Sequence, residues 1–209
     1  MKVAIVSESP ADEAAVRILA EAVLDTTIET VPVARRAGGV DSALSILKPA
    51  LYSAHYQQTA DGVILVVDSN NTPVHSGPVD GRCERAERCR LCRARQRADE
   101  VLAALSPVPG RQPVRVAVGL AVPAIEAWYL CGSDPHVSEA AWTQGQAESR
   151  PPYTRAELKQ KVYGTDRASL ELETQKAVEE MTRLVQDLDA LRSRFPVGFG
   201  ALEHDLGPW

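Results

Sequence analysis

Runs of hydrophobic residues separated by segments of helical periodicity fill the first 131 residues of the chain. Residues 2–7 and 63–68 are hydrophobic without alternation, a pattern typical of parallel strands buried on both faces. Two further strands are expected over 28–33, where β-branched residues alternate, and over 114–120. The pattern therefore predicts four strands, with 63–68 in the centre of the sheet.

The segments between these runs have helical character. The first starts at Pro10, which suits the first turn of a helix, and continues to about Leu24. An arginine-rich helix is expected from about residue 80 to 105, and Pro123 opens a further short helix. Strands that alternate with helices predict right-handed crossovers and an α/β fold, an open and mostly parallel four-stranded sheet flanked by helices.

The character of the chain changes after Cys131. Residues 132–152 are polar and poor in strand signals, and helical patterns follow at 154–163 and 167–194. We divide the chain accordingly into an α/β domain over 1–131, with an insertion at 69–105, and a helical C-terminal extension packed on it over 132–209.

Composition and charge limit the partners of such a protein. The 209 residues are 44% hydrophobic and 24% charged, which is ordinary for a globular chain. The formal net charge is −5, so a nucleic-acid partner would need a local basic patch. No run reaches the ~18 to 20 hydrophobic residues of a membrane span, and the N-terminus lacks a signal-peptide pattern. We therefore expect a cytoplasmic protein without a membrane partner, whose four cysteines are reduced.

Three acidic residues come directly after predicted strands. Glu8 follows the first strand, Asp68 ends the third, and Glu126 lies one turn into the helix after the fourth. The carboxyl ends of parallel strands meet at one edge, where open α/β sheets bind ligands. Carboxylates gathered there repel one another unless a proton or cation compensates, and oxygen ligands favour Mg²⁺ or Mn²⁺. Each acid could instead cap or complement a neighbouring helix.

The residues around these acids resemble the Toprim family, which includes domains of topoisomerases, bacterial primases and overcoming-lysogenization-defect nucleases. In segment 6–12 a strand is followed by Glu8, and in 66–70 a hydrophobic strand ends in an Asp-x-Asp position. Further similarity, to small stand-alone bacterial Toprim-like proteins, lies in 123–130 with its Glu-x-Trp motif, in Tyr163-Gly164 and in 195–209. The resemblance spans nearly the whole chain and implies a Toprim-like sheet.

The resemblance also implies roles for individual residues. In Toprim enzymes the glutamate after the first strand is a general acid/base or metal ligand, and the first aspartate of the pair binds Mg²⁺. By position, the candidate catalytic residues are Glu8 and Asp68. The second aspartate is replaced by Asn70, whose amide oxygen can coordinate a cation but adds no charge. The candidate metal ligands are Glu8, Asp68, Asn70 and Glu126, with Asp12 or Asp80 as other sources of the missing charge.

Seven arginines between Asp80 and Arg97 form a local cationic segment. On a helix, Arg90, Arg93 and Arg97 would share one face beside the acidic edge, an arrangement that suits contacts to a phosphate backbone. The alternative is a solvated helix face with ion pairs such as Glu84 to Arg88. The candidate nucleic-acid-binding residues are Arg82, Arg85, Arg90, Arg93 and Arg97.

Three cysteines and an upstream histidine fall in the same part of the chain: His75, Cys83, Cys89 and Cys92. Three thiolates and one imidazole would satisfy a tetrahedral structural Zn²⁺. Their spacing is irregular, so buried free cysteines are the alternative.

Together these features favour a Mg²⁺- or Mn²⁺-dependent Toprim-type enzyme that acts on nucleic-acid phosphodiesters, with nuclease activity as the first choice. The alternative is a catalytically degenerate Toprim module that binds nucleic acid or a protein partner in a regulatory role. A phosphotransfer receiver domain fits Asp68 but lacks the paired acids after the first strand and a lysine after a later strand.

Overall fold

The computed structural model describes residues 1–33 and 39–209 of the chain. Its sheet contains β1 (Lys2–Val6), β2 (Glu29–Val31), β3 (Gly62–Asp68) and β4 (Arg115–Ala121), all parallel, in the order β2-β1-β3-β4. Every residue of β3 is buried, as expected of a continuous hydrophobic run between two neighbouring strands. The predicted four-stranded α/β fold is confirmed, although β2 is shorter than its hydrophobic run.

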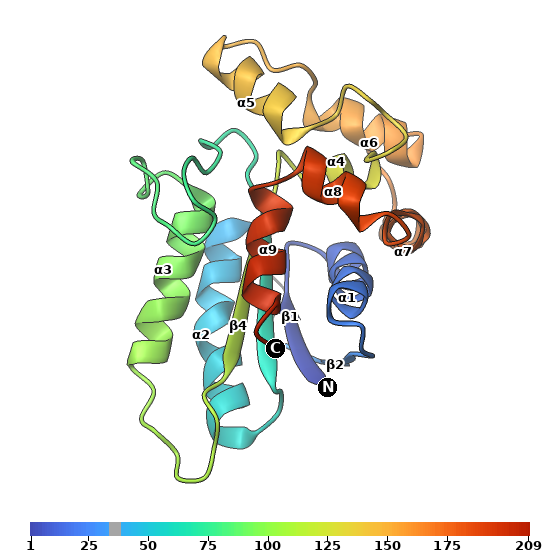
Figure 1. Cartoon of the computed structure of the whole chain (residues 1–209). Coiled ribbons are helices and arrows are strands. Elements are labelled where there is room, and N and C mark those ends of the chain that lie inside the picture. Colours follow the sequence, from blue (N-terminus) through green and yellow to red (C-terminus); the bar gives the residue numbers. More distant parts are fainter. Residues whose placement is uncertain (34–38) are drawn as a thin grey trace.

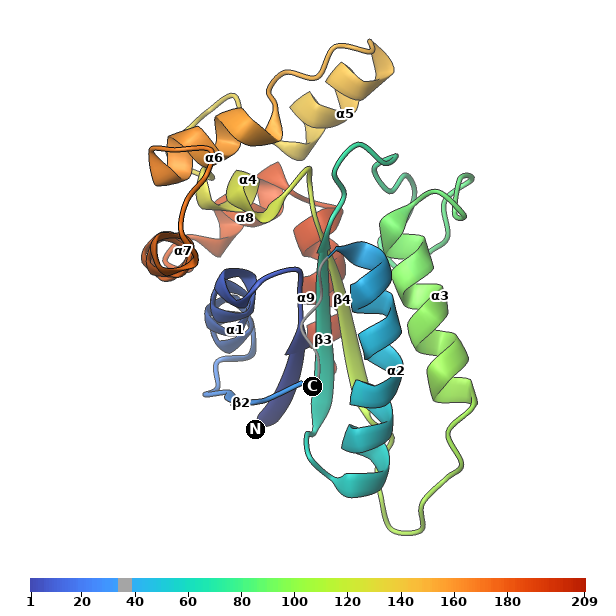
Figure 2. The ribbon, with the colours of Figure 1, turned by 180° about the vertical axis from the view of Figure 1, so that it is seen from behind.

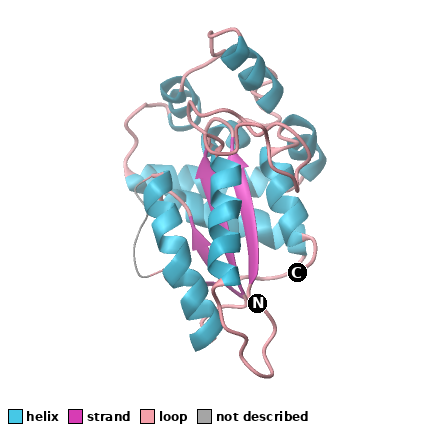
Figure 3. Ribbon diagram, turned by 90° about the vertical axis from the view of Figure 1, so that its left-hand side faces the viewer, coloured by secondary structure: helices cyan, strands magenta, loops and turns pink. Residues whose placement is uncertain are grey.

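Helices cover both faces of this sheet. Helices α1 (Pro10–Leu24) and α9 (Gly198–Leu206) lie on one face, and α2 (Val40–Gln57) and α3 (Arg90–Ala103) lie on the other (Figures 1 and 2). Figure 3 shows the strands running behind a layer of helices. From β1 the chain moves outward to β2 and then crosses to β3 and β4, so the strand order reverses between β1 and β3. Open α/β sheets bind ligands at such a reversal, beyond the carboxyl ends of the strands.

The other helices of the described chain lie mainly beyond that carboxyl edge (Figure 1). Among them, α7 also packs along α1. Their bounds are α4 (Ile125–Tyr129), α5 (Glu139–Ala147), α6 (Arg155–Tyr163), α7 (Leu170–Leu184) and α8 (Leu188–Arg194).

The last helix is an integral layer of the core. Gly198 of α9 approaches β4 so closely that a Cβ atom there would lie 2.0 Å from the Leu120 carbonyl oxygen. Phe199 and Leu202 are fully buried, and residues on both sides of position 131 belong to one hydrophobic core. The C-terminal segment therefore completes one face of the sheet as well as packing on the α/β domain.

Three segments differ from the helices that the sequence predicts. The arginine-rich helix begins at Arg90, because residues 80–89 form turns that bring the cysteines together. Helix α5 lies in the polar segment 132–152, where the Ser138 hydroxyl caps it by accepting from the Ala141 amide (3.1 Å). The pattern over 167–194 is divided into α7 and α8, because Asp187 caps a new helix there.

No helix in residues 1–33 and 39–209 has the length and hydrophobicity needed to cross a membrane.

Candidate functional site

Glu8, Asp68 and Glu126 come together at the reversal in strand order. The Asp68 amide donates to Glu8 Oε1 at 3.2 Å, and Asp68 Oδ1 accepts from the amide of Ile125, the first residue of α4, at 3.1 Å. Glu126 is the next residue, so the loops after β1, β3 and β4 meet here. Asp68 and Glu126 are each only 3% exposed. We refer to these three residues together with Asp12 as the acidic edge.

Asp12 joins this group from the first turn of α1, where Ser9 caps the helix through the Asp12 amide (3.2 Å). Burial, followed by the charge of Glu126, raises the pKa of Asp12 to about 7, against the opposing effects of Ser9 and Arg155. Burial also raises the pKa of Asp68 well above its ordinary value, although Arg155 acts in the opposite direction. The carboxylates of the acidic edge therefore repel one another, and burial leaves them poorly solvated.

Glu126 has one partnered and one unpartnered oxygen. Its Oε1 accepts from the Tyr163 hydroxyl at 3.4 Å and lies 3.8 Å from Lys159 Nζ, which is closer to Glu173 Oε1 at 2.7 Å. Its Oε2 is buried and has no hydrogen-bond partner among the described residues. A buried polar atom without a partner is costly, so this oxygen marks a position where a ligand would be stabilising.

Arg155, which sequence analysis missed, supplies positive charge at this edge. Its Nη2 lies 2.6 Å from Asp68 Oδ2 and its Nη1 lies 3.0 Å from Asn70 Oδ1. Burial alone would lower the pKa of Arg155, but the nearby carboxylates, Asp68 first, raise it. The Thr154-x-x-Glu157 capping box indicates in the sequence that a helix starts here, but not which residues its first turn contacts.

Asn70, a candidate metal ligand at this edge, is fixed through its backbone. Its backbone adopts a left-handed conformation (φ 49°), which asparagine tolerates better than most residues, and its amide donates to the Pro123 carbonyl at 2.7 Å. Asp80, by contrast, lies on a loop beside Arg95 and Gln96 and is not among the charges that act on Asp68. The other acidic residues whose charge acts on Asp68 are Asp12, Glu126 and Glu8.

One arginine of α3 contacts the acidic edge directly. This is Arg90, whose Nη1 donates to the Asp68 carbonyl at 2.6 Å and lies 3.7 Å from Glu8 Oε1. Arg93 and Arg97 follow on the same helix and pair with Asp41 (2.7 Å) and Glu100 (3.6 Å), and their role in binding nucleic acid stays a prediction.

The arginines before α3 have different environments. Arg82 Nη2 donates to Gln96 Oε1 at 3.1 Å. Arg85 and Arg88 are exposed, and their side chains make no hydrogen bond or ion pair with any described residue. The expected pair of Glu84 with Arg88 does not form in the described chain, because both residues precede the helix.

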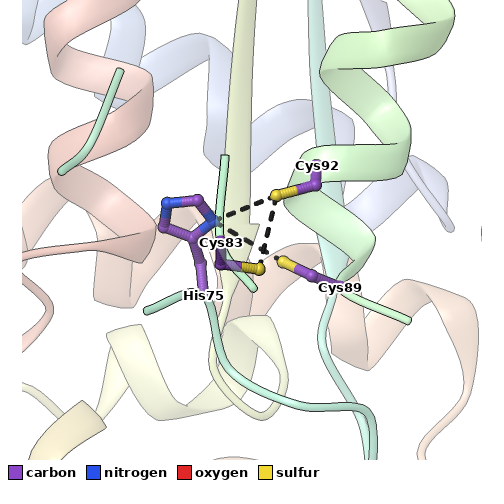
Figure 4. Close-up of side chains that lie close together, drawn as sticks. All are labelled: His75, Cys83, Cys89 and Cys92. Atoms are coloured by element: carbon purple, nitrogen blue, oxygen red, sulfur yellow. Dashed lines mark hydrogen bonds between the residues drawn. The ribbon is translucent and has the colours of Figure 1, made fainter. Parts of the chain in front are cut away.

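His75, Cys83, Cys89 and Cys92 converge on one point, although their spacing in the sequence is irregular (Figure 4). Their ligand atoms all lie within 4.8 Å of one another, and all four residues are buried. Cys83 Sγ and Cys92 Sγ are 3.5 Å apart, and His75 Nδ1 lies 3.3 Å from Cys92 Sγ. Tetrahedral zinc with ordinary bond lengths places such atoms roughly 3.5–3.8 Å apart. This His/Cys3 cluster could hold a metal such as zinc.

The surroundings of the cluster suit a cation. His75 Nε2 lies 3.1 Å from the Pro78 carbonyl oxygen and can donate to it, which leaves Nδ1 free as a ligand. Burial raises the pKa of Cys89 to about 12 and also raises the pKa of Cys92, so their thiolates need a cation for stabilisation. The fourth cysteine, Cys131, is apart from the cluster and buried in the hydrophobic core.

No family model, curated protein or solved structure matches the chain. Its function must therefore be inferred from the acidic edge and the His/Cys3 cluster themselves.

Proposed function

We propose that the chain is a divalent-cation-dependent enzyme of the Toprim type that acts on nucleic-acid phosphodiesters, with nuclease activity as the first choice. The observation that carries this proposal is the buried, unpartnered Glu126 Oε2, in a group of four carboxylates beyond the strand ends. An unpartnered oxygen alone does not identify a cation ligand, since Glu139, which accepts from the Val197 and Gly198 amides, also has one. At Glu126 the neighbouring carboxylates Asp12 and Asp68 are what favour a cation.

The donor set of the acidic edge fits Mg²⁺ or Mn²⁺. All its donors are oxygens, and Asp68, Glu126 and Glu8 would hold the ion, with Asp12 and the amide oxygen of Asn70 as further donors. When bound, such an ion activates a water molecule and stabilises negative charge on a phosphate.

Side chains around the edge have complementary tasks. Arg90, fixed by the Asp68 carbonyl, and the half-exposed Arg155 can both donate to phosphate oxygens, and Arg155 has a planar pair of donors suited to them. Glu8 borders the same edge and is a candidate general acid/base. These residues would position the phosphodiester and move a proton at its oxygen atoms.

A second candidate function is a degenerate module that binds nucleic acid or a protein partner without turnover. The observation in its favour is Arg155, whose guanidinium contacts Asp68 and Asn70 as a cation would. If that ion pair is permanent, the edge needs no metal.

A structural Zn²⁺ at the His/Cys3 cluster is a separate part of the proposal. It would cross-link the loop after β3 to the start of α3, and so fix the segment that carries Arg82, Arg85 and Arg88. Reduced thiols of this kind persist in the cytoplasm, where we place the protein.

Cleavage assays test the proposal directly. Zinc-loaded protein is incubated with end-labelled DNA and RNA, single- and double-stranded, with Mg²⁺ or Mn²⁺. We expect cation-dependent cleavage that is lost in Asp68→Ala and Glu8→Gln and retained in Asp166→Ala, a change at an exposed acid outside the site. Wild-type protein that neither cleaves nor binds any of these substrates would rule the proposal out. Binding without cleavage would favour the degenerate module.

A further inference from the structure

A hollow of about 690 Å³ lies between the loop after β3 and helix α5. Residues of the loop, among them Asn71, Val74, Arg85 and Arg88, form one wall, and Trp142 and Gln146 of α5 form the other. Its volume falls within the ~300–1,000 Å³ typical of ligand sites.

Both walls are held in place by contacts outside the hollow. Cys83 borders the hollow and belongs to the His/Cys3 cluster, so a metal there would fix the loop wall. Gln146 Nε2 donates to the Thr72 carbonyl at 3.0 Å, which ties α5 to the same loop. With a metal in the cluster, both walls would be fixed before a ligand binds, which would lower the entropic cost of binding.

Arg85 and Arg88 give the hollow its charge. The arginines of α3 are engaged with acidic residues or backbone carbonyls, whereas these two have no side-chain partner in the described chain. Glu84 also borders the hollow, so its acidic charge is outnumbered by two guanidinium groups. Two unpaired guanidinium groups on one wall of a hollow are complementary to phosphate groups.

The lining between the charges suits unpaired bases. Val74 offers an apolar surface, while Asn71 and Gln146 offer amide donors and acceptors. Side chains inside a two-walled hollow can reach base faces and edges only when the bases are not stacked within a duplex. The chemistry therefore selects a single strand over a double helix.

The hollow and the acidic edge share the loop after β3. Asn71 directly follows Asn70, whose side chain contacts Arg155, and lies three residues after Asp68. We propose that this hollow binds single-stranded nucleic acid next to the phosphodiester at the acidic edge, with Arg85 and Arg88 on its phosphates. The assignment deepens the proposed function and rests on it.

Fluorescence anisotropy with labelled single strands of about 12 nucleotides tests the assignment. Zinc-loaded protein is titrated in Mg²⁺-free buffer, so that binding is measured without cleavage. We expect Arg85→Gln/Arg88→Gln to weaken binding at least tenfold and to reduce the slope of log K against log salt by about 1.4, or 0.7 for each contact. The control, Lys48→Gln/Arg167→Gln, removes the same charge from exposed positions outside the hollow and should change neither value appreciably.

Each outcome separates this inference from the proposed function. Equal losses in both double variants, equal affinity for duplex and single strand, or no binding by the wild type would overturn the assignment. Cation-dependent cleavage that is unaffected by Arg85→Gln/Arg88→Gln would overturn it and leave the proposed enzyme intact. Strand binding that depends on the two arginines, in a protein that never cleaves, would support the hollow and contradict the enzyme. Unchanged circular dichroism and zinc content establish that the variants are folded.

Discussion

Arg155 and Asp68 lie 87 positions apart in the chain, yet Arg155 Nη2 is 2.6 Å from Asp68 Oδ2. The two partners differ in solvation, since the Asp68 side chain is 5% exposed and that of Arg155 is 45% exposed. The arginine can therefore move into solvent more easily than the aspartate. A divalent cation at the acidic edge would have to displace it from Asp68.

Replacing Arg155 with glutamine should tighten Mn²⁺ binding. The competing positive charge is lost, while Asp68, Glu8 and Glu126 remain, so the Mn²⁺ dissociation constant should fall by roughly tenfold, or about 1.4 kcal/mol. The same change should destabilise the metal-free protein by about 1–3 kcal/mol, because Asp68 loses its partner. Isothermal titration calorimetry and urea unfolding measure the two effects.

Arg155→Lys is the matched control for that pair, since it retains the charge but not the planar fork. Its Mn²⁺ affinity should stay near that of the wild type. Weaker Mn²⁺ binding in Arg155→Gln would mean that Arg155 supports the metal site and does not compete with it.

Asp12 should make the stability of the metal-free protein depend on pH. Its folded-state pKa is raised from 3.8 to about 7, so the folded protein holds a proton that the unfolded chain has released between these values. The contribution of Asp12 to stability should therefore decrease as the pH rises from about 4 to 7 and level off above that. Asp12→Asn removes the effect and should stabilise the metal-free protein at pH 8 by up to about 4 kcal/mol, the free energy that corresponds to a pKa raised from 3.8 to about 7.

Urea unfolding at pH 5 and pH 8 measures the prediction for Asp12. The gain in Asp12→Asn should be larger at pH 8, whereas Asp166→Asn, at an exposed position, should show no such difference. An equal gain in stability of Asp12→Asn at the two pH values would contradict burial as the cause of the raised pKa of Asp12. A loss of stability at pH 8 would contradict it as well.

The His/Cys3 cluster should bind one zinc ion per chain. Elemental analysis should find that ion in the wild type and lose it in Cys92→Ser. At free zinc about 100 times the dissociation constant, the ion contributes about 2.7 kcal/mol, equivalent to about 5–10 °C in Tm for a chain of this size. Chelation should therefore lower Tm by that amount.

Cys131→Ser is the control for the cluster, because this cysteine is buried but lies outside it. That variant should retain zinc even if its core is weakened. Zinc in Cys92→Ser at the wild-type level, or none in the wild type, would exclude the cluster as a zinc site.

The sequence predicts those parts of the site that follow from strand order. The uninterrupted hydrophobic run of β3 identifies a central strand, and the rule that parallel strands end at one edge brings Asp68 and Glu8 together. Hydrophobic patterns carry this information because a strand that is hydrophobic on both faces must be buried on both, which leaves few positions for it in the sheet. The same rule predicts that Glu126 lies at this edge, because it follows the end of β4.

The remaining parts depend on contacts that periodicity does not encode. Arg155 is one polar residue in a polar helix, and only the packing of α6 beyond the strand ends shows that it contacts Asp68. Helix α3 starts at Arg90 because Cys83 and Cys89 converge with His75 just before it. The spacing of the arginines in the sequence does not reveal this convergence. Long-range ion pairs and ligand clusters are set by tertiary structure, where local propensity has little weight.

Calorimetric titration of the zinc-loaded protein with Mn²⁺ tests the central claim, that the acidic edge is a divalent-cation site. Mn²⁺ prefers oxygen donors, so the zinc-filled thiol cluster does not compete for it. We predict one Mn²⁺ bound per wild-type chain, and none in Asp68→Asn or Glu126→Gln variants that remain folded. A folded wild-type protein that binds no Mn²⁺, or variants that bind it as the wild type does, would contradict the account.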